Sequence, residues 1–402
     1  MASALTGRAA ATVFGAVPGR GLGEMDCGAM PIGETSMEPP GKACRFHITH
    51  WDLRGKWAPT SKMASVEMRA AVLSEPGPLD ERRLVVCDVP VPKPGPNDVL
   101  LRVRACGVCR TDLHIALGEL PRRRSPVILG HQIVGEIVAS GARASRPLGS
   151  RVGVSWLGGT DGTCFFCTHG RENLCDAPTF TGYYVDGGFA EYAVARSDFV
   201  FPLPEALDDL HAAPLLCAGI IGFRSLRVAG VQPGERVGLY GFGSSAHLAL
   251  PVLRAWGCTV AVATRGQKHR AFAEAMGADW VGGPLERPPY ALDRVVTFAP
   301  AGDVVIAALG ALRKGGVVAI NAIHLDRMPR FDYDSLLWGE REIRSVANMT
   351  RDDARDFIAL AVQIGLEPEV TVYPLDHAVE ALRAVERDAL DGAAVIVPSS
   401  AG

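Results

Sequence analysis

An excess of positive charge and a long uninterrupted apolar run are both missing from this sequence. The 41 Lys and Arg residues nearly balance 44 Asp and Glu residues, and the formal net charge is −3. This balance gives no electrostatic basis for binding nucleic acid or an anionic membrane, so we expect neither partner. No apolar run approaches the roughly 18 residues that a membrane-spanning helix needs, so we expect no membrane insertion.

Cysteine is sparse for a chain of this length, with ten in 402 residues. Disulfide-stapled scaffolds are much shorter chains, so this class is excluded. Three of the cysteines stand in the pattern Cys164-x2-Cys167-x7-Cys175, a spacing typical of metal binding. A reducing cytoplasm suits these thiols best.

The chain is long enough for two domains, and 48% of its residues are hydrophobic. Residues 1–65 are rich in Ala, Gly, Pro, Ser and Thr without a regular hydrophobic period, so we expect a disordered extension. Such a stretch also fits translation upstream of a true start at Met63 or Met68.

From Met68 onward, short strands separated by Pro and Gly turns predict a β-rich, barrel-like first domain. The predicted strands are Arg69–Leu73, Leu84–Val91, Asp98–Ala105, Ile133–Val138, Arg151–Ser155 and Gly187–Val194. From about Ala218 the pattern changes to strands that alternate with helices, which predicts a doubly wound parallel sheet. This part has strands at 237–240, 259–263, 294–298 and 316–320, and helices at 246–256, 267–276 and 304–312. A helix at 352–364 and a strand at 393–397 follow.

One stretch combines thiols and imidazoles at separations that suit a metal. Cys106-Gly-Val-Cys-Arg-Thr-Asp-Leu-His114 is followed by Gly130-His131-Gln132, and we expect both on loops. Cys109 and His131 are the first two predicted zinc ligands, and Cys217 is the third. Three mixed sulfur and nitrogen ligands leave one tetrahedral position open, as a catalytic zinc requires. The alternative is that all three are ordinary buried side chains.

A glycine-rich loop, Gly241-Phe-Gly243-Ser-Ser-Ala246, lies between a predicted strand and a predicted helix. In this context the G-x-G-x-x-A pattern predicts that a dinucleotide pyrophosphate binds at the helix N-terminus. The next strand usually ends in an acid that binds the ribose 2′-hydroxyl, but here it ends in Thr264-Arg265. A hydroxyl and a guanidinium favour a 2′-phosphate, so we expect NADP in preference to NAD.

Taken together, these motifs resemble the zinc-containing alcohol dehydrogenases of the medium-chain dehydrogenase/reductase superfamily. The similarity runs from Met68 to the C-terminus. It implies an α/β fold made of a GroES-like catalytic domain, residues 66–218 completed by 348–402, and a Rossmann nucleotide-binding domain, residues 219–347. It also implies a homo-oligomer, dimer or tetramer, that interconverts alcohols and aldehydes with NAD(P).

The resemblance assigns roles to further residues. Asp112 would orient His131, and Arg110 would lie near the cofactor pyrophosphate. Thr111 would accept the proton of the alcohol and pass it through the cofactor ribose to His114. Each could instead have an ordinary role: Thr111 in a turn, His114 and Arg110 as solvated side chains.

Three positions depart from the family pattern. The second metal lobe usually begins with a cysteine, but here Asp161 precedes Cys164, Cys167 and Cys175. A carboxylate can bind zinc, so we expect a structural zinc with Asp161 as fourth ligand and His169 as the alternative. Gln132 replaces a glutamate beside His131. Gly392-Ala393 replaces a Gly-Arg, which removes one contact to a cofactor phosphate.

The resemblance also predicts the substrate pocket. Trp156 matches a lining position, and Ala116 and Leu120 stand where some relatives that act on small alcohols have tryptophans. We therefore expect a widened outer pocket and a preference for alcohols larger than ethanol. The alternatives are a zinc-dependent polyol or sugar dehydrogenase, which Gln132 disfavours, and a non-catalytic NADPH-binding relative.

Overall fold

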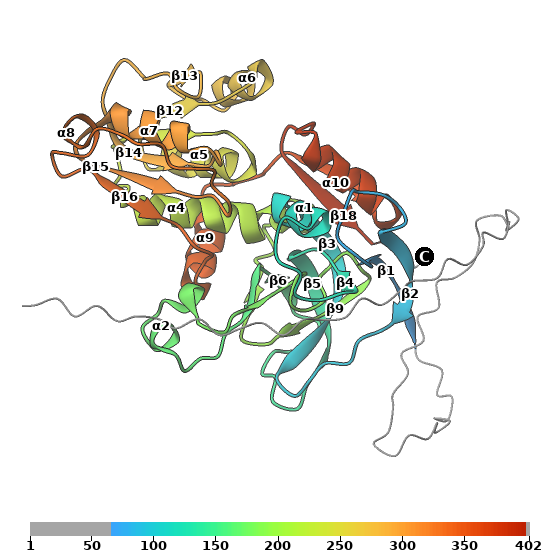
Figure 1. The fold of residues 1–402 in the computed structure, drawn as a ribbon. Coiled ribbons are helices and arrows are strands. Elements are labelled where there is room, and N and C mark those ends of the chain that lie inside the picture. The colour runs from blue at the N-terminus through green and yellow to red at the C-terminus, as the bar shows by residue number, and fades with distance from the viewer. Residues whose placement is uncertain (1–65, 399–402) are drawn as a thin grey trace, which may run out of the picture. The chain divides into compact units, whose positions relative to one another are not determined.

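The computed structural model describes residues 66–398. The predicted disordered extension, residues 1–65, lies outside the described residues. Two large sheets organise the rest, one in the first part of the chain and one in the nucleotide-binding part (Figure 1).

The first large sheet has the strand order β10-β6-β5-β3-β18-β17, with β9 also paired to β3. Its strands are β3 (Asp98–Val108), β5 (Gln132–Ser140), β6 (Arg151–Val154), β9 (Tyr192–Arg196), β10 (Val200–Pro202), β17 (Val370–Pro374) and β18 (Ala393–Val397). The last two come from the end of the chain, and β18 pairs antiparallel with β3. The C-terminal segment therefore returns to the first sheet.

Two smaller sheets accompany this one. The order β2-β1-β4 joins β1 (Glu67–Leu73), β2 (Leu84–Pro90) and β4 (Val127–Ile128). A two-stranded sheet joins β7 (Leu157–Gly159) and β8 (Thr179–Phe180). Short elements complete this part: α1 (Arg110–Leu117), α2 (Phe165–Thr168), η1 (Glu172–Leu174), η3 (Leu375–His377) and α10 (Ala378–Glu386).

The second large sheet is parallel throughout, with the order β13-β12-β11-β14-β15-β16. Its strands are β11 (Arg236–Tyr240), β12 (Thr259–Ala263), β13 (Trp280–Gly282), β14 (Leu292–Thr297), β15 (Leu312–Ile320) and β16 (Glu342–Ser345). The helices of this part are α4 (Ile220–Ala229), α5 (Ser244–Ala255), α6 (Gln267–Ala275), α7 (Gly302–Ala311), α8 (Tyr333–Leu336) and α9 (Arg351–Gln363). The doubly wound parallel sheet that the sequence predicted is confirmed.

A continuous helical run, Asp209–Ala229, joins the two parts and combines α3 (Asp209–Pro214), η2 (Leu215–Gly219) and α4. By length and composition alone it could cross a membrane, with a mean hydropathy of 1.4 in its most apolar window. Charged or imidazole side chains at 209, 211, 224 and 227 interrupt it, so its uninterrupted apolar stretch covers only residues 212–223. Within the protein, 78% of its most apolar window is buried. A helix that is apolar on all sides is typical of a protein core as well as of a membrane.

Two expectations differ from the structure. The Cys106–His114 stretch is not a loop, because Cys106 lies near the end of β3 and His114 lies on α1. The predicted strand Gly187–Val194 becomes regular only from Tyr192. The preceding Gly187 and Gly188 N–H groups donate instead to the Ile128 and Gly130 carbonyls, at 2.8 and 2.9 Å. A Cβ on Gly187 would lie 2.0 Å from the Gly130 carbonyl oxygen, so this close approach requires glycine.

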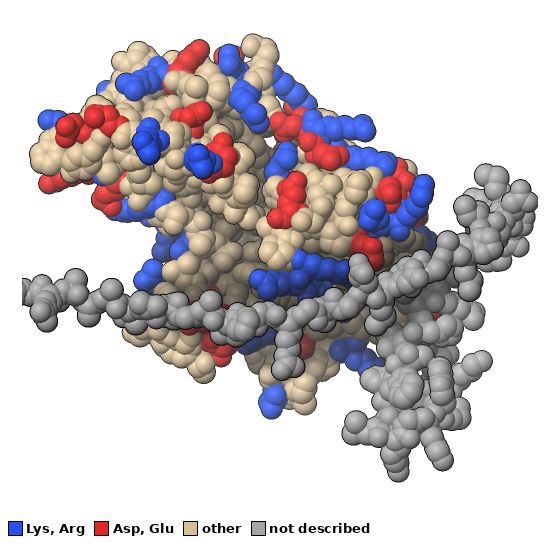
Figure 2. Space-filling model, in the orientation of Figure 1, with Lys and Arg blue, Asp and Glu red and all other residues tan. Residues whose placement is uncertain are grey.

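Charged side chains of both signs are interspersed over the visible face of the described residues (Figure 2). Among the described residues, many charged side chains form ion pairs, such as Arg104 with Glu136 and Arg254 with Asp279. This face therefore carries no large field of one sign, in keeping with the small net charge of −3.

Candidate functional site

Cys109, His131 and Cys217 come together although more than a hundred residues separate the first from the last. Their Sγ and imidazole nitrogen atoms all lie within 4.8 Å of one another. Cys109 is the N-cap of α1, His131 lies between β4 and β5, and Cys217 lies on η2. Pro214 directly precedes η2 and has no N–H to donate, which favours the wider π-helical turn that carries Cys217.

The side chain of Asp112 is completely buried and orients two members of this cluster, Cys109 and His131. One carboxylate oxygen lies 3.0 Å from His131 Nδ1 and accepts a hydrogen bond from the Gly130 N–H at 3.1 Å. The other accepts from the Cys109 N–H at 2.9 Å. These bonds place the Nδ1 proton toward Asp112, so that Nε2 is the ring nitrogen left to bind a ligand.

The remaining ring nitrogen, His131 Nε2, is buried and has no hydrogen-bond partner among residues 66–398. A buried polar atom without a partner is costly, and a metal held jointly with the two thiols would satisfy it. The hydrogen bond from the Cys217 thiol, against the effect of burial, lowers the pKa of Cys109 well below its usual value. This shift favours the thiolate of Cys109, which is the form that coordinates a metal.

Burial by itself would lower the pKa of His131, but Asp112 and Cys109 outweigh it and raise that pKa to about 10. A divalent cation at this position competes with the proton for Nε2, so binding releases a proton. The three residues therefore fit a zinc ion in charge, donor type and spacing.

The two residues predicted to transfer the proton, Thr111 and His114, both lie on α1. Thr111 is 4% exposed, and its Oγ1 lies 3.7 Å from Cys109 Sγ. His114 is partly exposed and its Nδ1 contacts the carboxylate of Glu119. Arg110, at the start of the same helix, donates to the Val385 carbonyl on α10 at 3.0 Å. Its guanidinium thus ties α1 to α10, a contact that the sequence did not indicate.

An aromatic wall borders the Cys and His cluster. The Trp156 ring meets His131 edge-on, with ring centroids 5.0 Å apart. Phe180 and Tyr183 stack on Trp156 at centroid distances of 4.8 and 5.8 Å. Of these three rings the sequence predicted only Trp156, although the aromatic pair Tyr183-Tyr184 directly after Gly182 is a local signal for the wall.

The two other predicted pocket residues lie on and after α1. Ala116 is 1% exposed and packs in the hydrophobic core of the first part. Leu120 is half-buried against the same core. A large side chain at Ala116 would therefore have to displace core atoms, whereas Leu120 has more room.

A second metal-type group consists of Asp161, Cys164, Cys167 and Cys175, whose ligand atoms also lie within 4.8 Å of one another. Asp161 Oδ1 accepts hydrogen bonds from the Cys164 and Thr163 N–H groups at 2.9 and 2.8 Å. These bonds hold the pKa of Asp161 well below its usual value, so the carboxylate is ionised. Its second oxygen remains available to a metal.

His169, the alternative fourth ligand, does not belong to this group. Its ring stacks on Phe165 at a centroid distance of 4.2 Å, and its Nδ1 lies 2.7 Å from the Phe165 carbonyl oxygen. The geometry therefore favours Asp161.

The glycine loop has the form that a dinucleotide phosphate needs. Gly241 has a φ of +92°, and a Cβ there would lie 2.8 Å from the Ala299 nitrogen. Gly243 precedes α5, and a Cβ there would meet nothing within 4 Å, so this side of the loop is open. Ala246 is completely buried in the first turn of α5. The helix N-terminus and the open glycine together can accept a pyrophosphate.

The basic residues after β12 are not equivalent. Lys268 pairs with Asp391 at 2.9 Å, and His269 Nε2 lies 2.9 Å from the Asp388 carboxylate. The Arg265 guanidinium is exposed and makes no hydrogen bond or ion pair within residues 66–398. Thr264, beside it, is 5% exposed. Arg270 donates from Nε to the Thr264 carbonyl at 3.2 Å. Among these four basic residues of the described chain, Arg265 therefore has the side chain without a protein partner.

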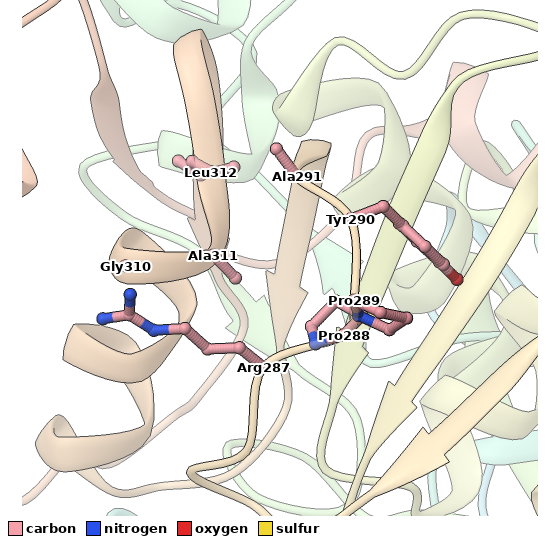
Figure 3. A pocket seen from close by; sticks show the side chains of 8 residues that line it. All are labelled: Arg287, Pro288, Pro289, Tyr290, Ala291, Gly310, Ala311 and Leu312. Carbon is pink, nitrogen blue, oxygen red and sulfur yellow. The ribbon is translucent and has the colours of Figure 1, made fainter.

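A pocket of about 310 Å³ lies elsewhere on the nucleotide-binding part (Figure 3). It is lined by residues 287–291 and 310–312, and the Arg287 side chain extends over Gly310. Its lining offers no thiol, imidazole or carboxylate, and none of the predicted site residues belongs to it. It is therefore not a candidate for the reaction site.

Comparison with known proteins agrees with this geometry. Residues 95–205 match the family model described as an alcohol dehydrogenase GroES-like domain. A Mycobacterium tuberculosis protein named "Probable alcohol dehydrogenase AdhA" is 44% identical over 343 residues, which cover 84% of this chain and 99% of that protein.

Solved structures give the same result. One is described as a zinc-binding dehydrogenase from Sinorhizobium meliloti bound to NADP, with 26% identity and a TM-score of 0.73 over 83% of this chain and 100% of that one. Another is a cobalt- and zinc-bound thermostable alcohol dehydrogenase from Pyrobaculum aerophilum, with 25% identity and a TM-score of 0.74 over the same shares. The chain therefore belongs to the zinc-containing alcohol dehydrogenase family of the medium-chain dehydrogenase/reductase superfamily, and it is an oxidoreductase.

Proposed function

We propose that this enzyme interconverts a primary alcohol and its aldehyde with NADP(H), at a zinc ion held by Cys109, His131 and Cys217. The observation that carries the proposal is the buried, unpartnered His131 Nε2 beside two thiols whose sulfur atoms lie within 4.8 Å of it. Zinc bound there acts as a Lewis acid that makes the substrate hydroxyl acidic near neutral pH, and the nicotinamide exchanges the hydride.

The residues of this chain position the substrate and move its proton. Asp112 holds His131 in the orientation and tautomer that present Nε2. Thr111, buried beside Cys109, takes the hydroxyl proton, and His114 on the same helix delivers it to solvent. Trp156, Phe180 and Tyr183 exclude water from the reacting carbon and supply an apolar surface for the substrate chain.

The nucleotide occupies the Gly241–Ala246 loop, with the adenosine 2′-phosphate beside Thr264 and Arg265. The unpaired Arg265 guanidinium supports NADP over NAD, because a bidentate contact to a phosphate is among the stronger charge-assisted interactions. The same proposal divides the chain into a catalytic domain, residues 66–218 with 348–402, and a nucleotide-binding domain, residues 219–347. A second, structural zinc is bound by Asp161, Cys164, Cys167 and Cys175.

Two further features belong to the proposal. The cysteines of both clusters carry no disulfide, which suits a cytoplasmic enzyme. Tyr333 and Trp338 are 55% and 62% exposed near the edge strand β16, an apolar surface that suits assembly into a homo-oligomer.

The test combines metal content with turnover. We expect two zinc ions per subunit by elemental analysis, and reduction of aldehydes by NADPH in a steady-state panel that pairs alcohols, polyols and aldehydes with both cofactors. Removing zinc with a chelator should abolish turnover and leave NADPH fluorescence quenching intact. Full activity without metal would refute the proposal, and selective oxidation of polyols would favour the sugar dehydrogenase alternative.

A further inference from the structure

We infer that Glu119 is a positioning residue that holds His114 in the tautomer able to accept the substrate proton. This inference rests on the proton relay of the proposed function. Its starting observation is the direct contact between the Glu119 carboxylate and His114 Nδ1. Nothing in the sequence pattern marks Glu119, because it follows the end of α1 and belongs to none of the motifs.

The end of α1 brings Glu119 back onto His114. Gly118 adopts a left-handed conformation with a φ of +81°, which ends the helix and reverses the chain. The Glu119 N–H then donates to the His114 carbonyl at 2.9 Å, and its side chain reaches the imidazole of the same residue. Backbone and side chain of Glu119 therefore both bind His114.

The chemistry of the contact fixes the imidazole tautomer. An ionised carboxylate can only accept hydrogen bonds, so the nitrogen that faces it must carry the proton. His114 is then protonated on Nδ1 and has its lone pair on Nε2. A relay that ends at His114 needs such a bare nitrogen, because the imidazole must accept a proton when the alcohol loses one.

The proton balance is simple. Nε2 accepts the proton that the alcohol releases through Thr111, which makes His114 an imidazolium beside the Glu119 carboxylate. The imidazolium then gives the Nε2 proton to water, which restores the original tautomer. The side chains are 24% exposed for His114 and 54% exposed for Glu119, so water reaches this end of the relay. Solvent screening at this exposure keeps the expected effect moderate.

Glu119→Gln tests the inference, because the amide can donate as well as accept and no longer imposes one tautomer. We expect kcat to fall about 3- to 10-fold, a small part of what general acid–base catalysis contributes, while KM stays nearly constant. In ¹⁵N-histidine NMR of the full-length enzyme, the Nδ1-protonated signal of His114 should give way to a mixture of tautomers. Glu205→Gln, an exposed glutamate with no hydrogen bond or ion pair in the described part of the chain, is the matched control and should leave both readouts unchanged.

His114→Gln separates the inference from the relay on which it rests. If His114→Gln lowers kcat and the double variant with Glu119→Gln falls no further, the two residues act as one unit, as we expect. If His114→Gln lowers kcat but Glu119→Gln changes neither kcat nor the tautomer, the role of Glu119 is refuted and the relay stands. Unchanged kcat in His114→Gln would refute the relay and Glu119 together, while zinc-dependent turnover would still support the proposed chemistry.

Discussion

At the scale of single residues, the proposed preference for NADP rests on two neighbouring positions. Thr264 and Arg265 stand at the end of β12, where an acid would select the free ribose hydroxyl. The neighbouring cations cannot substitute for Arg265, because Lys268 and His269 are already bound to Asp391 and Asp388. The proposed preference for NADP over NAD therefore depends on one exposed guanidinium.

Replacing Arg265 by alanine should raise KM for NADPH about tenfold or more and leave KM for NADH nearly unchanged. A charge-assisted contact to phosphate contributes about 1.5–3 kcal/mol, which converts to this range. Lys268→Ala is the matched control and should affect both cofactors alike. Equal loss with NADPH and NADH in Arg265→Ala would show that the guanidinium does not bind the 2′-phosphate.

At the scale of elements, the segment 161–175 carries the second metal-type group, and hydrogen bonds fix it both internally and to a distant part of the chain. Within it, backbone N–H groups orient Asp161 toward the three thiols. Two residues of the same segment bind the chain near α9. Asn173 donates to the Ala347 carbonyl at 2.8 Å, and the buried Glu172 accepts from the Arg351 N–H at 3.0 Å. The segment thus connects the first part of the chain with the start of α9.

Asp161→Ala should lower the zinc content from two toward one per subunit. It should reduce the melting temperature more than it reduces kcat. The substitution removes the charged carboxylate and leaves only the three thiolates as ligands. Because the free energy of zinc binding contributes to the free energy of folding, the variant should also be less stable. His169→Ala should keep both zinc ions, since this ring is stacked on Phe165. Two tightly held zinc ions in Asp161→Ala, measured by elemental analysis after dialysis, would exclude Asp161 as a ligand.

In the proposed function, the aromatic wall and the end of α1 together set the length of the preferred alcohol. With Trp156, Phe180 and Tyr183 on one side and a leucine at position 120, we expect kcat/KM to rise from ethanol to hexanol. Each additional buried CH₂ contributes about 0.8 kcal/mol, a few-fold in kcat/KM. Leu120→Trp should shift the optimum to shorter alcohols.

Ala116→Trp would be a poor test of pocket width, because Ala116 lies in the core and the variant would disturb packing. Leu148→Trp is a better control for Leu120→Trp, since this leucine is 65% exposed and outside the pocket. A kcat/KM series that falls steadily from ethanol to hexanol in the unmodified enzyme would contradict the widened pocket.

At the scale of the whole molecule, the metal cluster and the nucleotide loop belong to different sheets. Cys109 follows β3 of the first sheet, whereas Gly241 follows β11 of the parallel sheet. Cys217, the third proposed zinc ligand, lies on the helical run 209–229 that joins them.

Cys217→Ser should remove or weaken the catalytic zinc and abolish turnover, while NADPH binding remains nearly intact. A hydroxyl is a far weaker zinc ligand than a thiolate, and the glycine loop does not depend on it. Cys258→Ser makes the same exchange at a buried thiol outside both clusters and should retain zinc and activity. Loss of NADPH quenching in Cys217→Ser alone would show that the two sites are not independent.

The sequence by itself determined the chemistry and most of the architecture. The Cys, His and glycine motifs are local patterns whose spacing reflects metal and phosphate geometry, so Cys109, His131 and the Gly241–Ala246 loop could be named directly. Alternation of strands and helices likewise predicted the parallel sheet. Asp161 could be singled out because it interrupts a cysteine pattern.

Only the tertiary structure decided which of these residues meet, and which others join them. The Glu119–His114 contact depends on the left-handed turn at Gly118, and the stacking of Phe180 and Tyr183 on Trp156 depends on how β7 and β8 pair. Lys268 and His269 are occupied by a loop more than a hundred residues away. Such contacts follow from how distant segments pack against one another, and no local pattern of residues records that packing.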